Sequence, residues 1–422
     1  MTSEIKQRIE QIRRGEVPER YVKTALGLAP TDWKRYTFGD IYTERKEPGD
    51  ENLPLLMVSI HSGVSDGEVD AAELPKQVKR IEDKSQYKKA VSGDLVFNMM
   101  RAWQGAIGTV RTTGMVSPAY IVAEPNDKAY PLFMDYYSRT PQMINQIDRQ
   151  SYGVTDFRKR LYWDSFAPIS CTLPPIEEQQ KIAAILTTQD KVIELKEKRL
   201  AEKQRQKKYL MQQLLTGKKR LPGFSGEWKN IKLCEVLSER KEKNVEQNLR
   251  ICSVAVQKGV IDQIEHLGRS YAASDTSNYS VAHYGDIIYT KSPTGDFLYG
   301  IVKQNLLQET VAVSPLYGVF TPMTFGLGYF LHTYFQSAIC AQNYLLPIVQ
   351  KGAKNTINIT NDTFISSKLY LPLDVEEQKA IADTFIAADR EINLLRQDIE
   401  QEKQKKKALM QLLLTGIVRV KT

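Results

Sequence analysis

The chain has 422 residues, of which 42% are hydrophobic, 26% charged and 9% aromatic. This composition is typical of a globular protein with roughly two to four structural units. It excludes a wholly disordered chain, a collagen-like fibre and a disulfide-framed miniprotein. The net charge of +8 is a weak indication of a polyanionic partner, since many mildly basic proteins have none.

The N-terminal segment begins MTSEIKQRIEQIRRGE and lacks the apolar core of a signal peptide. No run of about eighteen apolar residues occurs, so we expect a cytoplasmic protein without membrane contact. Residues 1–30 are predicted as an N-terminal helical segment, in which Ile5, Ile9 and Ile12 share one face. This segment matches the end of a later long helix, and a freestanding amphipathic helix is an equal alternative.

Residues 31–175 are predicted as a first α+β domain with a mixed, curved sheet. Short apolar runs at 53–60, 93–100 and 119–123 indicate strands, and a helix is expected around Leu132–Ile147. Two polar loops follow these elements. They contain basic, amide, hydroxyl and aromatic side chains: Arg101, Trp103, Gln104, Ser151, Tyr152, Arg158, Lys159 and Arg160.

Residues 176–217 are predicted as one long helix, entered through Pro174 and Pro175 and ended by Gly217. Apolar residues at a seven-residue spacing predict a coiled-coil seam, which consists of Leu186, Ile193, Leu200 and Leu214. The seam becomes polar midway, so this helix needs a partner helix. Its second half is strongly basic, which is consistent with either a solvated face or a polyanion contact.

Residues 218–373 are predicted as a second α+β domain, with strands at 285–290 and 316–320 and a helix around Gly328–Leu345. Its polar loops contain Lys291, Thr294, Lys351, Lys354 and Asn355. Residues 374–416 form a second long helix and 417–422 a C-terminal tail. The seam of this helix consists of Phe385, Ile392, Ile399 and Leu413.

The two halves of the chain repeat each other. IEEQQKIA at 176–183 matches VEEQKAIA at 375–382, and LMQQLLTG at 210–217 matches LMQLLLTG at 409–416, both at an offset of 199 residues. Within the domains, GDLV at 93–96 returns as GDII at 285–288, and SPAY at 117–120 returns as SPLY at 314–317. The repeat predicts two tandem α/β domains separated by two long helices that pair antiparallel as a coiled coil, with an internal pseudo-two-fold repeat.

The usual signatures of catalysis are missing from the sequence. TGKKR at 216–220 lacks the first glycine and the hydroxyl of a phosphate-binding loop, and no NPPY-like methyltransferase tetrapeptide occurs. The triplets Glu44-Arg45-Lys46 and Glu239-Arg240-Lys241 fit half of a metal-nuclease pattern, but surface ion pairing explains them better. We therefore expect no catalytic, cofactor-binding or metal-ligating residues in this chain, and we interpret it as a recognition module.

Two variable domains alternate with near-identical helices, which open with LPPIEEQ or LPLDVEEQ and close with LMQxLLTG. This pattern resembles the specificity subunit of type I restriction-modification enzymes over essentially the whole chain. The resemblance implies a non-catalytic subunit that binds double-stranded DNA. Each domain would be a target-recognition domain that reads one half of a bipartite, asymmetric site. The polar loop residues named above in the two domains would then be the candidate contacts with DNA, since arginine or lysine can read guanine and asparagine or glutamine can read adenine. The helices would set the spacer between the half-sites.

The same resemblance implies the partners. The helices would bind two adenine methyltransferase subunits, and two restriction subunits that translocate DNA would complete the complex. S-adenosylmethionine, ATP and magnesium would belong to those partners. Two alternatives remain at the level of the sequence: a non-enzymatic coiled-coil scaffold that binds protein or RNA, and a free-standing nuclease.

Overall fold

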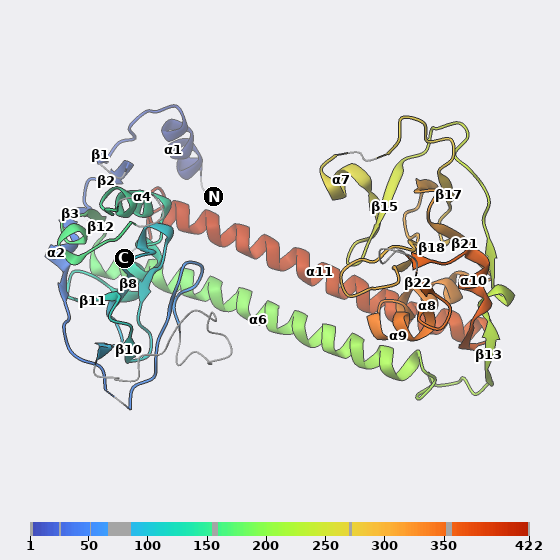
Figure 1. The fold of residues 1–422 in the computed structure, drawn as a ribbon. Helices are drawn as coiled ribbons and strands as arrows, with labels where there is room; N and C mark the ends of the chain where they lie inside the picture. Colours follow the sequence, from blue (N-terminus) through green and yellow to red (C-terminus); the bar gives the residue numbers. More distant parts are fainter. Residues whose placement is uncertain are drawn as a thin grey trace. The chain divides into compact units, whose positions relative to one another are not determined.

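The computed structural model describes residues 3–24, 27–50, 52–65, 86–153, 159–269, 272–351 and 357–420 (Figure 1). The chain divides into two compact units, Met1–Leu195 with Ile399–Thr422, and Lys196–Asp398. Both dividing points fall inside the long helices α6 (Ile176–Leu214) and α11 (Val375–Leu413). Each unit therefore contains one α+β domain, one end of α6 and the opposite end of α11.

The first unit is built around a four-stranded antiparallel sheet in the order β4-β11-β8-β9. Its strands are β4 (Tyr42–Glu44), β11 (Tyr120–Pro125), β8 (Leu95–Asn98) and β9 (Ile107–Thr109). Four two-stranded ladders accompany it: β1 (Tyr21–Thr24) with β2 (Gly27–Pro30), β3 (Lys34–Thr37) with β12 (Ser170–Leu173), β5 (Val58–Ser59) with β6 (Gly63–Val64), and β7 (Lys88–Ala90) with β10 (Gly114–Val116). The shorter helices are α1 (Ser3–Arg13), α2 (Phe38–Ile41), η2 (Ala102–Gln104), α3 (Pro131–Tyr137), α4 (Pro141–Arg149) and α5 (Trp163–Phe166).

The second unit contains a sheet of the same connectivity, in the order β14-β21-β18-β19. Its strands are β14 (Leu237–Glu239), β21 (Gly318–Pro322), β18 (Ile287–Tyr289) and β19 (Val302–Gln304). A second sheet has the order β16-β15-β20-β17, formed by β16 (Gly259–Asp262), β15 (Ile251–Ala255), β20 (Val311–Val313) and β17 (Ser280–Ala282). The remaining elements are β13 (Trp228–Lys232) paired with β24 (Lys368–Pro372), β22 (Gln350–Lys351) paired with β23 (Ile357–Asn358), and helices η4 (Leu233–Glu235), α7 (Gln263–Leu267), α8 (Phe325–Tyr334), α9 (Ala338–Leu345) and α10 (Asn361–Ser366).

The predicted mixed sheet is wrong for the first unit, whose named strands pair antiparallel in several small sheets, but it is present in the second unit, where the sheet β16-β15-β20-β17 combines parallel and antiparallel pairs. Parallel pairing between named strands occurs in the second unit, where β15 pairs with β20. The helix predicted around Leu132–Ile147 is two helices, since Pro141 starts α4 and Thr140 Oγ1 accepts a bond from Met143 N. The helix predicted around Gly328–Leu345 is likewise interrupted, at Ser337, the N-cap of α9.

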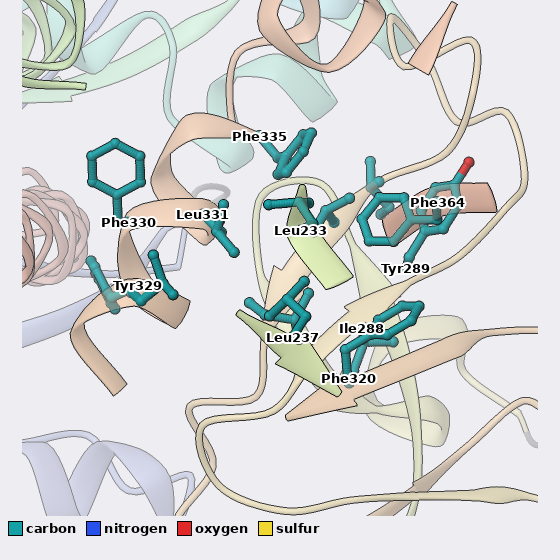
Figure 2. Packing of buried hydrophobic residues seen from close by; sticks show 14 of the residues in the cluster. Leu233, Leu237, Ile288, Tyr289, Phe320, Tyr329, Phe330, Leu331, Phe335 and Phe364 are labelled. Atoms are coloured by element: carbon teal, nitrogen blue, oxygen red, sulfur yellow. The ribbon is translucent and has the colours of Figure 1, made fainter. Parts of the chain in front are cut away.

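Aromatic side chains form the centre of each core. In the second unit Tyr289 stacks on Phe364 with ring centroids 4.5 Å apart, and Phe320 lies 5.2 Å from Phe364 (Figure 2). The Tyr289 hydroxyl is satisfied because it donates to Tyr299 O at 2.7 Å. In the first unit Phe166 lies between Phe38 and Phe97, at 4.3 and 4.6 Å. Such rings contribute packing contacts beyond the area they bury.

Opposite ends of the two long helices pack together inside each unit. In the first unit Leu186 of α6 shares a core with Leu413 of α11, and in the second unit Leu214 of α6 shares a core with Phe385 of α11. The seam residues Leu186, Ile193, Leu214, Phe385, Ile392, Ile399 and Leu413 are all buried. Leu200 is only partly buried, because polar residues occupy the middle of the seam.

The polar middle of the seam is satisfied by bonds within each unit. In the first unit Gln189 Nε2 donates to Glu402 Oε2 at 2.7 Å, and Lys406 pairs with Asp190. In the second unit Lys196 pairs with Asp398 at 2.8 Å, and Lys207 pairs with Asp389. The pairs Lys406–Asp190 and Lys207–Asp389 are related by the 199-residue offset.

Both helices end at a glycine with positive φ, Gly217 at 68° and Gly416 at 70°. None of the described helices is both long and apolar enough to cross a membrane.

Candidate nucleic-acid interface

The first unit brings two of the predicted loops together. Arg101 and Gln104 belong to the turn that follows β8, whereas Tyr152 and Arg160 pair across a hairpin with N–O distances of 2.9 and 2.7 Å. Leu161 N donates to Met99 O at 2.8 Å, which ties the end of the hairpin to the start of the turn. Segments about fifty residues apart in sequence therefore form one surface, which we call the first loop surface.

Basic and aromatic side chains lie next to each other on the first loop surface. Lys159 Nζ lies 5.6 Å from the centroid of the Trp103 ring and pairs with Asp148 at 2.8 Å. Tyr152 is 63% exposed, and Arg101, Gln104 and Arg160 are exposed. Within the described residues no hydrogen bond or ion pair engages the guanidinium of Arg101 or Arg160. These side chains are free to meet base edges or phosphates.

Two of the predicted contacts in this domain have a different outcome. Ser151 is buried, and its hydroxyl donates to Ile147 O at 2.7 Å. Its predicted contact with nucleic acid is wrong, because the side chain instead closes the end of α4. Arg158 lies outside the described residues.

In the second unit the loop after β18 contains Lys291 and Thr294. Thr294 is exposed and its backbone pairs with Phe297 in both directions at 3.0 Å. Lys291 has a positive φ of 54° and is half-buried, and this burial lowers the pKa of its ammonium, partly offset by Glu239. Lys351 belongs to β22, which pairs with β23 as Tyr152 pairs with Arg160 in the first unit. Lys354 and Asn355 lie outside the described residues.

The triplets that fit half of a nuclease pattern have structural partners. Arg45 donates to Asp94 at 2.8 Å, and Arg240 donates to Asp286 at 2.6 Å. Glu239 accepts a bond from Asn361 at 2.6 Å. Asp94 and Asp286 are the aspartates of the repeated Gly-Asp pairs, so this ion pair recurs in both units. Among the described residues no group of three His, Cys, Asp or Glu side chains could hold a metal ion.

The repeated Glu-Glu-Gln at the start of each long helix has a function that the sequence reasoning missed. Its second glutamate, Glu178 or Glu377, is buried and bonds to an arginine that follows the end of the other long helix, Arg419 or Arg220. The glutamine bonds a backbone carbonyl before the helix, Pro174 O from Gln179 at 2.9 Å. The sequence contains a signal for these ion pairs, because Arg220 and Arg419 are separated by the same 199 residues as the two glutamates.

These geometries define a protein with two α+β domains, each packed with opposite ends of two long helices. The model of the type I restriction modification DNA specificity domain matches residues 71–204 and 226–404. The chain therefore belongs to the type I restriction-modification DNA specificity family, which confirms the resemblance found in the sequence.

Individual relatives agree with the family. The chain is 24% identical over 449 residues to the type I restriction enzyme MjaVIII specificity subunit of Methanocaldococcus jannaschii, covering 96% of this chain and 97% of that protein. It is 28% identical over 174 residues to the HindI specificity subunit of Haemophilus influenzae, covering 39% of this chain and 37% of that protein. The crystal structure of a type I restriction-modification S subunit from M. genitalium has a TM-score of 0.54 at 11% identity, over 92% of this chain and 97% of that one. That likeness shows the fold.

Proposed function

We propose that the chain is the non-catalytic DNA-reading subunit of a type I restriction-modification complex, with one half of an asymmetric, bipartite site read by each unit. The family membership carries this proposal. The first loop surface supports it, because exposed arginine, glutamine and tyrosine side chains are the groups that read guanine and adenine or bind phosphate. The different loop residues of the second unit suit a second, unrelated half-site.

The long helices would form the spacer between the half-sites and dock two adenine methyltransferase subunits. The antiparallel contacts inside each unit support this proposal, since the start of α6 meets the end of α11 in one unit and the reverse holds in the other. Two restriction subunits would complete the complex. S-adenosylmethionine, ATP and magnesium would be bound by those partners.

The decisive experiment is co-expression of the chain with an adenine methyltransferase subunit from the same genome, followed by mapping of methylated adenines. We expect one asymmetric bipartite motif, absent when either protein is omitted. A scaffold that binds protein or RNA would leave the methylation pattern unchanged. A free-standing nuclease would instead cut DNA without the partner in the presence of magnesium.

Replacing one domain at a time tests which half of the DNA motif each domain reads. Replacing residues 31–175 with the equivalent domain of another family member should change one half of the motif, and replacing 218–373 should change the other half. Methylation of the original motif by either chimaera would contradict the assignment of one half-site to each unit.

A further inference from the structure

The second unit contains a cavity of about 1070 Å³. Its walls come from the last part of α6, the middle of α11, strand β19, and the turn between α8 and α9. This volume is close to the upper end of small-molecule sites, which range from about 300 to 1,000 Å³.

One wall carries a buried lysine. Lys303, in the middle of β19, is only 4% exposed and lines the cavity. Within the described residues its ammonium makes no hydrogen bond and no ion pair. Burial, followed by the repulsion from Lys207, lowers the pKa of Lys303 to about 8, although Asp389 raises it in part.

The acidic group in the lining attracts Lys303 but offsets the lowering of its pKa only in part. Asp389 of α11 is the one acidic side chain among the cavity-lining residues, and it already accepts bonds from Lys207 and from the Tyr329 hydroxyl. His332 of α8 is buried, and its Nδ1 accepts a bond from Gln304 N at 3.0 Å. The pKa of His332 is lowered by burial and by the charges of Lys303 and Lys207, so the imidazole is neutral.

The lining as a whole is cationic. It contains six basic residues against the single aspartate, namely Lys207, Lys208, Lys218, Lys258, Lys303 and Arg396. The first turn of α9, Ser337 to Cys340, also lines the cavity. Ser337 Oγ accepts from Cys340 N at 3.3 Å, which leaves the N–H groups of Ala338 and Ile339 without an acceptor inside the helix. Such a helix start favours an anion.

Apolar side chains occupy the rest of the lining, among them Met211, Leu307 and Tyr334. A ligand that fills this space therefore needs an apolar or aromatic part beside its anionic group. Inorganic phosphate alone would satisfy the cations and leave most of the volume empty.

The first unit lacks the central lysine. Gly108 of β9 is the equivalent of Lys303 of β19. Gly108 pairs with Val96 in the first unit, and Lys303 pairs with Ile288, the equivalent of Val96, in the second. In the first unit Asp135 accepts a hydrogen bond from Thr109 N, at the position where His332 accepts one from Gln304 N in the second unit. Asp135 also forms ion pairs with Arg111 and Arg139. The shared fold thus forms without a buried lysine here, which indicates that Lys303 serves a purpose particular to the second unit.

We propose that this cavity binds an organic phosphate of nucleotide size, with the phosphate held by Lys303 and the first turn of α9. The inference goes beyond the proposed function, because reading DNA requires no small ligand in this chain. Tyr334 and the neighbouring apolar side chains would contact the organic part.

Isothermal titration calorimetry of the full chain tests the proposal with four probes: ATP, AMP, pyrophosphate and adenosine. We expect saturable binding of ATP or AMP that is at least tenfold tighter than binding of adenosine or pyrophosphate. Lys303→Gln should weaken that binding at least tenfold, Lys303→Arg should retain most of it, and Lys229→Gln, on an exposed strand residue outside the cavity, should leave it unchanged.

Folding of the variants is checked by their unliganded melting temperature. If Lys303→Gln fails to fold, Arg396→Gln at the exposed rim provides the second test and should weaken binding at least threefold. Absence of saturable binding, or equal binding by wild type and both variants, would overturn the proposal. Displacement of the nucleotide by duplex DNA, with equal loss of duplex affinity in Lys303→Gln, would assign the cavity to the DNA backbone and also overturn it.

Discussion

Arg419 and Glu178 are separated by 241 residues, and the Arg419 guanidinium donates to both carboxylate oxygens of Glu178, at 2.8 and 2.7 Å. The same guanidinium bonds Asp32 twice at 2.8 Å, which lowers the pKa of that carboxyl group. Arg220 holds Glu377 in the same way in the second unit. Each pair joins the first turn of one long helix to an arginine that lies six residues beyond the end of the other.

Removal of the arginine should be strongly destabilising, because it leaves a glutamate that is almost fully buried without a counter-charge. We expect Arg419→Met to lower the free energy of unfolding by about 3–5 kcal/mol. The double variant Glu178→Gln, Arg419→Met should recover part of this loss. Urea unfolding followed by circular dichroism measures both.

The matched control is Arg199→Met. Arg199 is 63% exposed and pairs with Glu391 at 3.5 Å, so its removal should cost less than about 1 kcal/mol. Equal destabilisation by Arg199→Met and Arg419→Met would contradict a special contribution of the buried pair.

The seam provides a second comparison along one helix. Ile399 is 6% exposed, whereas Leu394 of the same helix is 56% exposed. Ile399→Asp should therefore destabilise the first unit by several kcal/mol, since it buries an unpaired carboxylate. Leu394→Asp should be close to neutral in a thermal unfolding experiment.

Leu200, which is half-buried, should show a smaller loss on replacement by aspartate than Ile399 does. The opposite order would mean that the seam in solution differs from the contacts described.

The elements predicted well from the sequence are those with a long period. The seven-residue spacing of apolar residues predicts both 39-residue helices and their seam, and the tertiary contacts reinforce this local pattern. The short strands were located only approximately, because runs such as 93–100 do not show which partner they pair with. Ser151 was misjudged for a related reason: a serine after a helix can face solvent or bond the helix end, and only the fold decides.

The Glu–Arg pairs and Lys303 illustrate two further limits. The repeat contains both partners of each pair, but the sequence alone does not show that a glutamate and an arginine 241 residues apart form an ion pair. Lys303 lies in a short segment, Ile-Val-Lys-Gln, where its neighbours suggest an ordinary alternating strand. Its burial depends on α8, which packs against β19, and on residues of α6 and α11 that line the same cavity.

The burial of Lys303 leads to a prediction about stability that does not depend on any ligand. The pKa of Lys303 is about 8 in the folded chain against 10.5 for an ordinary lysine. Below pH 8 the group is protonated in both the folded and unfolded states, and its burial then costs about 3 kcal/mol. Between pH 8 and 10.5 the folded group is neutral, so stability rises with pH and the cost disappears.

Lys303→Met should therefore raise the free energy of unfolding at pH 7 by up to about 3 kcal/mol, and this gain should vanish near pH 10.5. Urea unfolding at a series of pH values gives the measurement. The exposed control Lys229→Met should show no such pH-dependent gain. A destabilised Lys303→Met at pH 7 would mean that the ammonium has a partner.

The first loop surface can be tested by single arginines. Arg101→Ala and Arg160→Ala should weaken binding of the cognate duplex while leaving the melting temperature unchanged, because both side chains are exposed. Loss of a guanine contact should cost about 1–3 kcal/mol on the cognate site alone. Loss of a phosphate contact should weaken all sequences and reduce the salt dependence.

Fluorescence anisotropy at two salt concentrations separates these cases. Arg14→Ala, which removes an exposed arginine from the turn after α1, is the control and should leave affinity unchanged. If Arg101→Ala and Arg160→Ala both bind the cognate duplex like the wild type, the first loop surface does not contact DNA.

The proposed spacer role makes a prediction about length. Duplicating Gln189–Leu195 in α6 and Ile392–Asp398 in α11 adds seven residues to each helix at the dividing points of the two units. Seven residues preserve the seam period and add about 10.5 Å of helix. Because the Glu–Arg pairs and the loops are untouched, each unit should fold as before.

DNA rises about 3.4 Å per base pair, so the non-specific gap between the half-sites should lengthen by about three pairs while both half-site sequences stay the same. Inserting two residues in each helix would instead rotate the following turns by about 200° and should abolish methylation. Extending only one helix should also abolish it, since pairs such as Lys196–Asp398 would lose register. Methylome sequencing of cells that carry each variant with its methyltransferase gives the gap directly. Methylation by the seven-residue variant at the original spacing would show that the helices do not set the distance.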